Sequence, residues 1–294
     1  MINMNMMKNI TIKLLILGGM LFGAACEKNV VEYGATPISD EATAQFQLHY
    51  MVPSATGTAN SINKVELNGQ LLTNETAPLL TYNLIPSGTV GRFFVTEPGS
   101  VNLKLHKGPA SDLTLVYDQD FELPAGKYNV IVHDFDAPPI IIDNEAPYPK
   151  VITEYTGTTA WVKFYNLLYE TPGEPTDLRL QYQFQYTTDN DTGEKSDWAN
   201  LGEPVAFGEA TGWEPVTVNK TVEISQGTAR IDYRIRLIGD DGSDQGSLVL
   251  QNAAGNMVDY SDWWNAGVGR VYHHMLAGCR ATEPTAGVRL ATAL

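Results

Sequence analysis

The sequence is poor in basic residues. It has 19 lysines and arginines against 34 aspartates and glutamates, and its formal net charge is −15. Proteins that bind DNA or RNA obtain much of their affinity from lysines and arginines that neutralise phosphates, and a strongly acidic chain repels phosphate-rich partners at a distance. We therefore expect neither nucleic acid nor anionic lipid headgroups to be partners of this protein.

Long apolar runs and catalytic motifs are also missing. After residue 25, no stretch approaches the roughly 20 consecutive apolar residues that a membrane-spanning helix needs. The sequence contains no G-x-S-x-G nucleophile elbow, no H-E-x-x-H zinc motif, no Walker-type phosphate loop and no G-x-G-x-x-G loop. We therefore predict that the protein is not an enzyme and that it requires no cofactor.

Two residue pairs resemble reactive centres, but a role without chemistry is favoured for both. Asp134 and Asp136 would share a face if their strand extends that far, and paired carboxylates can hydrolyse glycosides. Acidic residues beside a Pro-Pro turn are more often solvated. His273 and His274 are neighbours whose side chains point to opposite faces of a strand, so they cannot chelate one ion without distortion.

The segment at residues 189–194, D-N-D-T-G-E, resembles the start of a calcium loop. Asp189 and Asp191 would supply alternating oxygen ligands before a glycine. The third ligand before the glycine and the glutamate at the far end of the loop are absent. A polar hairpin turn is therefore the favoured interpretation, and no metal site is predicted.

Helical periodicity is missing as well, because apolar residues recur with a period of two. Residues 44–50, 101–105, 179–186 and 230–237 each place one apolar and one polar face on an extended strand. Turn-forming pairs such as N-G, P-G, A-G and D-G separate these runs. Short strands joined by such turns are typical of antiparallel sandwiches. We predict an all-β protein with two tandem Ig-like β-sandwich domains.

The predicted domain boundaries lie in two stretches that interrupt the strand pattern. Few regular apolar positions occur at residues 27–41, and residues 137–158 contain four prolines around a short apolar run. The rest of the chain is long enough, at 43% hydrophobic residues, to form two cores. The predicted order is a signal peptide, a tether, a first sandwich and a second sandwich, at residues 1–25, 26–42, 43–155 and 156–294.

The first 26 residues have the order of an export signal. Basic residues precede an apolar segment at residues 14–22, and the small residues 23–25 lead directly to Cys26. This order resembles the lipobox of bacterial lipoproteins, with Gly23 where leucine is usual, a variation that lipoproteins of the Bacteroidota tolerate. The resemblance implies cleavage before Cys26, a lipid on its thiol and attachment to the outer membrane, with the cell surface favoured over the periplasmic face. Cys279 would then be the only cysteine left, which excludes an intramolecular disulfide and a zinc site built on cysteines.

The strand and turn motifs resemble a family of bacterial envelope β-sandwich modules that is described as a domain of unknown function. Members open with a V-K-F-x-N strand and close with an A-G-K-Y strand. Residues 125–128, A-G-K-Y, resemble the closing strand, and residues 162–166, V-K-F-Y-N, the opening one. The opening strands of the two halves are also similar to each other, as are the closing strands. The resemblance implies an Ig-like sandwich outside the cytoplasm and implies no reaction.

All five tryptophans lie in the second half of the chain: Trp161, Trp198, Trp213, Trp263 and Trp264. Large flat side chains on exposed sheets stack against sugar rings in many noncatalytic modules. Trp161 is expected in the core. Because neighbours on one strand face opposite ways, Trp263 and Trp264 cannot both be core residues. A ligand platform, a domain interface and cover by a loop stay open for them, and the candidate ligand-binding residues are Trp263, Trp264, Trp213 and Trp198.

These observations favour a noncatalytic, lipid-anchored envelope protein that binds a glycan or another protein through its second domain. A pilin-like fimbrial subunit and a periplasmic envelope scaffold are the alternatives. Precursors of such pilins are usually cleaved after an arginine shortly beyond the lipidated cysteine, whereas the first arginine after Cys26 is Arg92. The binding module is therefore the favoured function.

Overall fold

The computed structural model describes residues 41–85, 93–144, 158–219, 222–225, 227–252 and 254–293. They belong to one compact unit, Ser39–Leu294. The part of the chain that is described contains many β-strands and no α-helix, so the all-β prediction is confirmed. No helix within it has the length and apolar character needed to cross a membrane. Cys26, the expected tether up to residue 40 and the expected boundary at Tyr155 lie outside the described residues.

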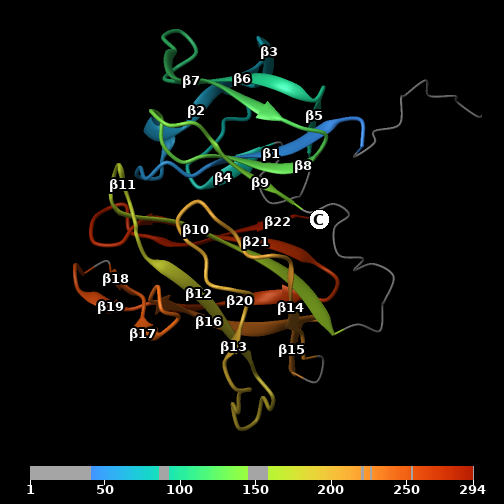
Figure 1. Cartoon of the computed structure of the whole chain (residues 1–294), viewed down its shortest axis with the longest axis vertical. Coiled ribbons are helices and arrows are strands. Elements are labelled where there is room, and N and C mark those ends of the chain that lie inside the picture. The colour runs from blue at the N-terminus through green and yellow to red at the C-terminus, as the bar shows by residue number, and fades with distance from the viewer. Residues whose placement is uncertain are drawn as a thin grey trace, which may run out of the picture. The chain divides into compact units, whose positions relative to one another are not determined.

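The N-terminal half forms two sheets around one core. The first sheet consists of β1 (Ala44–Tyr50), β4 (Asn83–Ile85), β5 (Phe94–Thr96), β8 (Gly126–Val132) and β9 (Ile140–Asp143). The second consists of β2 (Ile62–Leu67), β3 (Gln70–Thr73), β6 (Gly99–Lys107) and β7 (Thr114–Leu123). Within this half, β2, β6 and β7 lie over β1, β8 and β9 (Figure 1). Alternate apolar residues from both sheets, such as Phe46, Val65, Leu103 and Val130, are fully buried between them.

The C-terminal half repeats this layered arrangement with longer strands. Its first sheet consists of β10 (Thr159–Thr171), β11 (Glu174–Pro175), β14 (Glu214–Thr217), β21 (Val271–Cys279) and β22 (Gly287–Thr292). Its second sheet consists of β12 (Arg179–Tyr186), β13 (Ala199–Asn200), β15 (Glu223–Ser225), β16 (Thr228–Ile238), β17 (Asp244–Ser247) and β20 (Ser261–Gly267). A separate hairpin pairs β18 (Val249–Gln251) with β19 (Met257–Asp259). Within this half, β10 and β21 lie over β12 and β16 (Figure 1).

Both halves pair their opening strand with a later strand in parallel. In the first half β1 runs parallel to β8, and in the second half β10 runs parallel to β21. An equivalent backbone hydrogen bond lies at the start of each parallel pair. The Gly126 N–H donates to the Thr43 carbonyl at 3.0 Å, and the Gly269 N–H donates to the Thr159 carbonyl at 2.9 Å. The similar opening and closing strands seen in the sequence therefore occupy equivalent places in the two halves.

The sheets that contain these parallel pairs are buried on both faces. All seven residues of β1 and all nine of β21 are buried. Their outward faces meet in a shared apolar cluster that includes Met51 and Ile131 from the first half and Leu167 and Met275 from the second. Each sheet is thus covered by its own sandwich on one side and by the other half of the chain on the other side.

This packing buries the polar face of β1, which the alternating pattern assigns to solvent. Gln47 and His49 are completely buried although they alternate with apolar residues. The reason is that sequence periodicity describes one sheet, whereas this polar face is covered by a second sheet distant in sequence. The structure therefore corrects the expectation that this face of β1 is solvated.

Hydrogen bonds replace water for several of the polar groups between the halves, although both polar atoms of the Gln47 side chain are buried without a partner among the described residues. Asn129 is central: its Nδ2 donates to Tyr165 Oη at 2.7 Å, and its Oδ1 accepts from His49 Nε2 at 3.2 Å and from Asn144 Nδ2 at 3.1 Å. The Tyr165 hydroxyl donates in turn to His273 Nδ1 at 2.7 Å. Buried polar groups need such partners, because leaving one unpaired costs about 1–3 kcal/mol.

Candidate ligand-binding site

The outer face of the second C-terminal sheet carries the charged and aromatic residues of interest. Along β16, Ile231, Tyr233 and Ile235 are buried inward, whereas Arg230 and Arg234 lie on the opposite face. This is the period of two predicted for residues 230–237. It places a row of polar side chains on the face of the sheet that points away from the core of its own sandwich.

Trp263 and Trp264 occupy opposite faces of β20, as expected for neighbours on a strand. Trp263 is 47% exposed on the outer face. Trp264 is only 6% exposed and packs in the core, with its ring centroid 4.7 Å from that of Tyr272 and 4.6 Å from that of His274. Only Trp263 of the two is therefore available to a ligand.

Trp198 lies on the other flank of the same face. It directly precedes β13, and the register of β13 with β12, Phe184 opposite Ala199, places Trp198 beside Gln185. Gln185 is paired with Asp232 across β12 and β16, and Asp232 is paired with Trp263 across β16 and β20. One row across four strands therefore contains an indole at each end. Three strand spacings separate the backbones of the two tryptophans by about 14 Å.

A repeated motif supplies both indoles. Residues 196–202 read S-D-W-A-N-L-G and residues 261–267 read S-D-W-W-N-A-G. The first copy enters β13 beside β12, and the second forms β20 beside β16. The match of S-D-W-x-N-x-G is visible in the sequence, and it is the signal that would have singled out Trp198 and Trp263 among the five tryptophans.

Each indole of the row is stacked with an arginine of β16. The guanidinium carbon of Arg230 lies 4.7 Å from the ring centroid of Trp263, and that of Arg234 lies 4.3 Å from that of Trp198. Both distances are within the range of a cation–π interaction. The arginines hold the rings at fixed positions and add positive charge to this face of an acidic protein.

Asp232 neutralises two of the cations at the centre of the row. Its Oδ2 lies 2.8 Å from Lys195 Nζ, and its Oδ1 lies 2.7 Å from Arg230 Nη2. Burial by itself would raise the pKa of Asp232, but the hydrogen bonds and charges of Lys195 and Arg230 outweigh it and hold this pKa below its usual value. The carboxylate is therefore ionised at neutral pH and paired with Lys195 and Arg230.

These residues enclose a shallow depression of about 270 Å³, which we call the tryptophan groove. Its lining includes Trp198, Gln185, Asp232 and Trp263 from the row. Among the described residues, the Gln185 amide has no hydrogen-bond partner, so it offers a donor and an acceptor between the two indoles. Asp262 also lines the groove, and its Oδ1 accepts from the Trp263 N–H at 2.8 Å.

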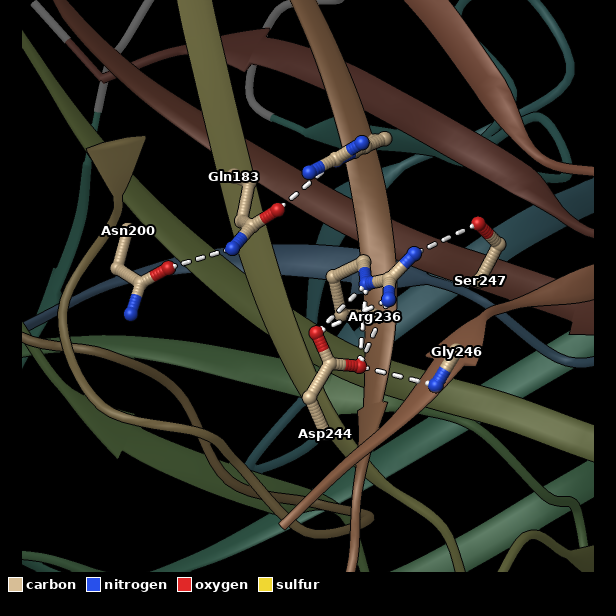
Figure 2. Close-up of polar contacts among 7 residues, drawn as sticks. Gln183, Asn200, Arg236, Asp244, Gly246 and Ser247 are labelled. Carbon is tan, nitrogen blue, oxygen red and sulfur yellow. Dashed lines mark hydrogen bonds and ion pairs between the residues drawn. The ribbon is translucent and has the colours of Figure 1, made fainter. Parts of the chain in front are cut away.

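A polar ladder beside the groove holds the face rigid. Figure 2 shows Gln183 bonded to Asn200 and Arg236 paired with Asp244. Gln183 Nε2 donates to Asn200 Oδ1 at 2.8 Å, and the Arg236 Nη2 atom lies 2.9 Å from each oxygen of Asp244. Paired contacts of this kind fix the plane of a guanidinium. The face that carries the groove is thus organised before any ligand binds.

The remaining tryptophans lie away from the groove. The Trp213 indole donates from Nε1 to the Asn144 carbonyl at 2.8 Å, and its ring lies 5.2 Å from that of His273. Trp161, expected in the main core, is only partly buried and packs against a small cluster formed by Val271 and Ala293. Neither reaches the outer face, because both lie on the sheet that packs toward the N-terminal half.

The other residues considered for chemistry form no site in the part of the chain that is described. β8 ends at Val132, and Asp134 Oδ1 accepts the Asp136 N–H at 2.9 Å in the turn that follows. Asp189 Oδ1 likewise accepts the Asp191 N–H at 2.8 Å, as in a polar turn. No group of three or more His, Cys, Asp or Glu side chains is placed to hold a metal ion among the described residues.

Comparison with models of known protein families and with curated protein sequences finds no match for this chain.

Proposed function

We propose that this protein is a noncatalytic binding module of the bacterial cell envelope, held at the outer membrane by a lipid on Cys26, and that it binds a glycan in the tryptophan groove. The observation that supports the proposal most is the row across four strands, with Trp198 and Trp263 at its ends and the free amide of Gln185 between them. Flat aromatic surfaces combined with a few hydrogen-bonding groups suit the alternating apolar and hydroxyl surfaces of sugars.

A glycan suits this face better than a protein does. The cores of protein interfaces are depleted in charged residues and bury about 800 Å² on each partner. Here the exposed indole of Trp263 is surrounded by Arg230, Asp232 and Lys195, which are charged. A shallow depression lined by charged residues suits a single extended chain of sugars better than it suits the apolar core of a protein interface.

Replacing Trp263 by alanine is expected to weaken polysaccharide binding at least about tenfold, because a tenfold loss corresponds to about 1.4 kcal/mol of lost stacking. The free energy of unfolding should change by less than about 1 kcal/mol, since the ring is half exposed. Affinity gels containing a panel of polysaccharides measure the first effect, and urea unfolding measures the second.

Leu71→Ala is the matched control for this variant. Leu71 is 55% exposed on β3 in the other half of the chain. Its removal should leave migration in every gel unchanged. If Trp263→Ala and Leu71→Ala migrate alike in all polysaccharides that retard the wild type, the groove is not the glycan site. Retardation by no polysaccharide, together with Trp263-dependent capture of a protein, would show that the ligand is a protein.

Protease added to intact cells is expected to digest the wild-type protein, because the lipid would hold both halves at the outer surface. Cys26→Ala removes the thiol that receives the lipid, so this variant should appear in the soluble fraction. An immunoblot with a periplasmic protein as control measures both effects. Full protection of the membrane-bound wild type would contradict surface display and favour the periplasmic scaffold.

A further inference from the structure

We infer that the tryptophan groove selects glycans with acidic sugars, and that Arg234 binds the sugar carboxylate. This inference rests on the proposed glycan-binding function and names its ligand class. It comes from the way in which charges are paired on the outer face of β16.

Among the described residues of this face, Arg234 and Arg179 are cations without an ion-paired carboxylate, and of the two only Arg234 is stacked on an indole of the row. Asp232 is shared by Lys195 and Arg230, and Asp244 is held by Arg236. Among the described residues, no carboxylate forms an ion pair with Arg234. The charge of Asp244 also acts on Arg234, but Asp232 and Asp244 are ion-paired with other cations. A positive charge is therefore left beside the groove in a protein whose net charge is −15.

The Arg234 guanidinium is nonetheless held in a defined orientation. Its Nε donates to Gln183 Oε1 at 2.8 Å, and its plane lies over Trp198 at 4.3 Å from the ring centroid. In the described part of the chain, its two terminal nitrogens have no hydrogen-bond partner. A carboxylate fits such an edge because it accepts two parallel hydrogen bonds from one arginine.

The position of Arg234 relative to the indoles suits one sugar chain bound along the row. Arg234 stacks on Trp198 at one end, and Trp263 lies at the other end of the same row. A sugar ring that packs against the groove would therefore place a substituent near Arg234 while its neighbours contact Gln185 and Trp263. The repeated S-D-W-x-N-x-G motif places an arginine-stacked indole at each end of the row, which suits a polymer of repeating units.

A purely structural role for the Arg234 and Trp198 stack is the alternative, because cation–π pairs also stabilise sheet surfaces. The two roles differ in what they predict. Replacing an arginine with a structural role changes the free energy of unfolding, and it changes the affinity for acidic and neutral ligands equally. An arginine that binds a carboxylate affects the affinity for acidic glycans more than the affinity for their neutral derivatives.

The test is titration calorimetry of the whole protein with polygalacturonate, alginate and hyaluronan, each compared with its carboxyl-reduced form in 0.15 M salt. The inference predicts tighter binding of at least one acidic polymer than of its reduced form. It also predicts that Arg234→Gln lowers the affinity for the acidic form at least about tenfold. The affinity for the reduced form should change little. Arg179→Gln is the matched control, since Arg179 is exposed on the same sheet and bonds only to the Pro204 carbonyl among the described residues.

Three results separate this inference from the function on which it rests. Equal binding of acidic and reduced forms, abolished by Trp263→Ala, overturns the role of Arg234 and leaves the glycan site in place. Equal losses for Arg234→Gln and Arg179→Gln overturn a specific carboxylate contact, because removal of any positive charge then has the same effect. No binding of any acidic, reduced or neutral polysaccharide overturns both proposals.

Discussion

Lowering the pH from 7 to 4.5 is expected to decrease the free energy of unfolding by several kcal/mol. Three histidines, His49, His273 and His274, are fully buried between or within the sandwiches. Burial lowers the pKa of His49 to about 4 and that of His274 to about 3, because a charged imidazole is poorly solvated there. The pKa of His273 lies well below its usual value for the same reason, and the nearby His49 and Lys163 charges lower it further.

The direction follows from proton binding in the two states. Above pH 6.5 both states are unprotonated at these histidines, so their contribution to stability is complete. Between pH 6.5 and the lowered pKa values, the unfolded chain binds protons that the folded protein does not, and stability falls by about 1.4 kcal/mol per pH unit for each histidine. His49 and His274 together amount to about 6 kcal/mol over two pH units, and His273 acts in the same direction. This loss is comparable with the total stability of an ordinary domain.

Urea unfolding at intervals between pH 7 and pH 4.5 measures this effect. Carboxylates with lowered pKa, such as those of Asp118, Asp232 and Asp244, lose their contribution only below about pH 3.8, outside this range. His274→Gln should reduce the slope of stability against pH, even if it lowers stability at pH 7. A stability that stays constant from pH 7 to pH 4.5 would show that the histidines are accessible to protons in the folded protein.

Asn129→Ala is expected to lower the free energy of unfolding by about 3 kcal/mol or more at pH 7. The substitution removes the partner of His49, Asn144 and Tyr165 at once. Each buried polar group that loses its partner costs about 1–3 kcal/mol. Because Asn129 lies between the two halves, the variant should also weaken the coupling between their unfolding transitions.

Asn102→Ala provides the comparison for this variant. Asn102 is on the solvent side of β6, where its Nδ2 donates to Asp118 and Asp120 at 2.9 and 2.8 Å. Water replaces these bonds when the side chain is removed, so the loss should stay below about 1 kcal/mol. Urea unfolding followed by circular dichroism measures both variants. Similar losses for the two would mean that the polar groups between the halves are hydrated.

The strands could be predicted from the sequence because their alternating pattern is local. Residues 179–186 and 230–237 are β-strands, as the period of two indicates, and the polar sides of both form the outer face of the second C-terminal sheet. The same argument failed for the polar side of β1. Gln47 and His49 are covered by β10 and β21, more than 100 residues away in the chain, and no local pattern contains that contact.

The candidate site could be predicted only in part. Alternation along a strand correctly separates Trp263 from Trp264. Placing Trp198 in the same row requires the register of β12 with both β13 and β16, which depends on tertiary pairing. Trp213 is also a large flat side chain, but it directly precedes β14 in the sheet between the halves, where its indole donates to the Asn144 carbonyl and its ring is partly buried. The repeated S-D-W-x-N-x-G motif is the signal in the sequence that would have linked Trp198 with Trp263.

Hydroxyl-radical footprinting of the protein with and without a bound polysaccharide tests the central claim most directly. Mass spectrometry reports the oxidation of each tryptophan separately within the same sample. We expect a ligand that retards the protein in affinity gels to protect Trp198 and Trp263, while the buried Trp264 stays unreactive in both states. Protection at other residues, with Trp198 and Trp263 oxidised as fast as in the free protein, would show that the ligand binds elsewhere and that the tryptophan groove is not the binding site.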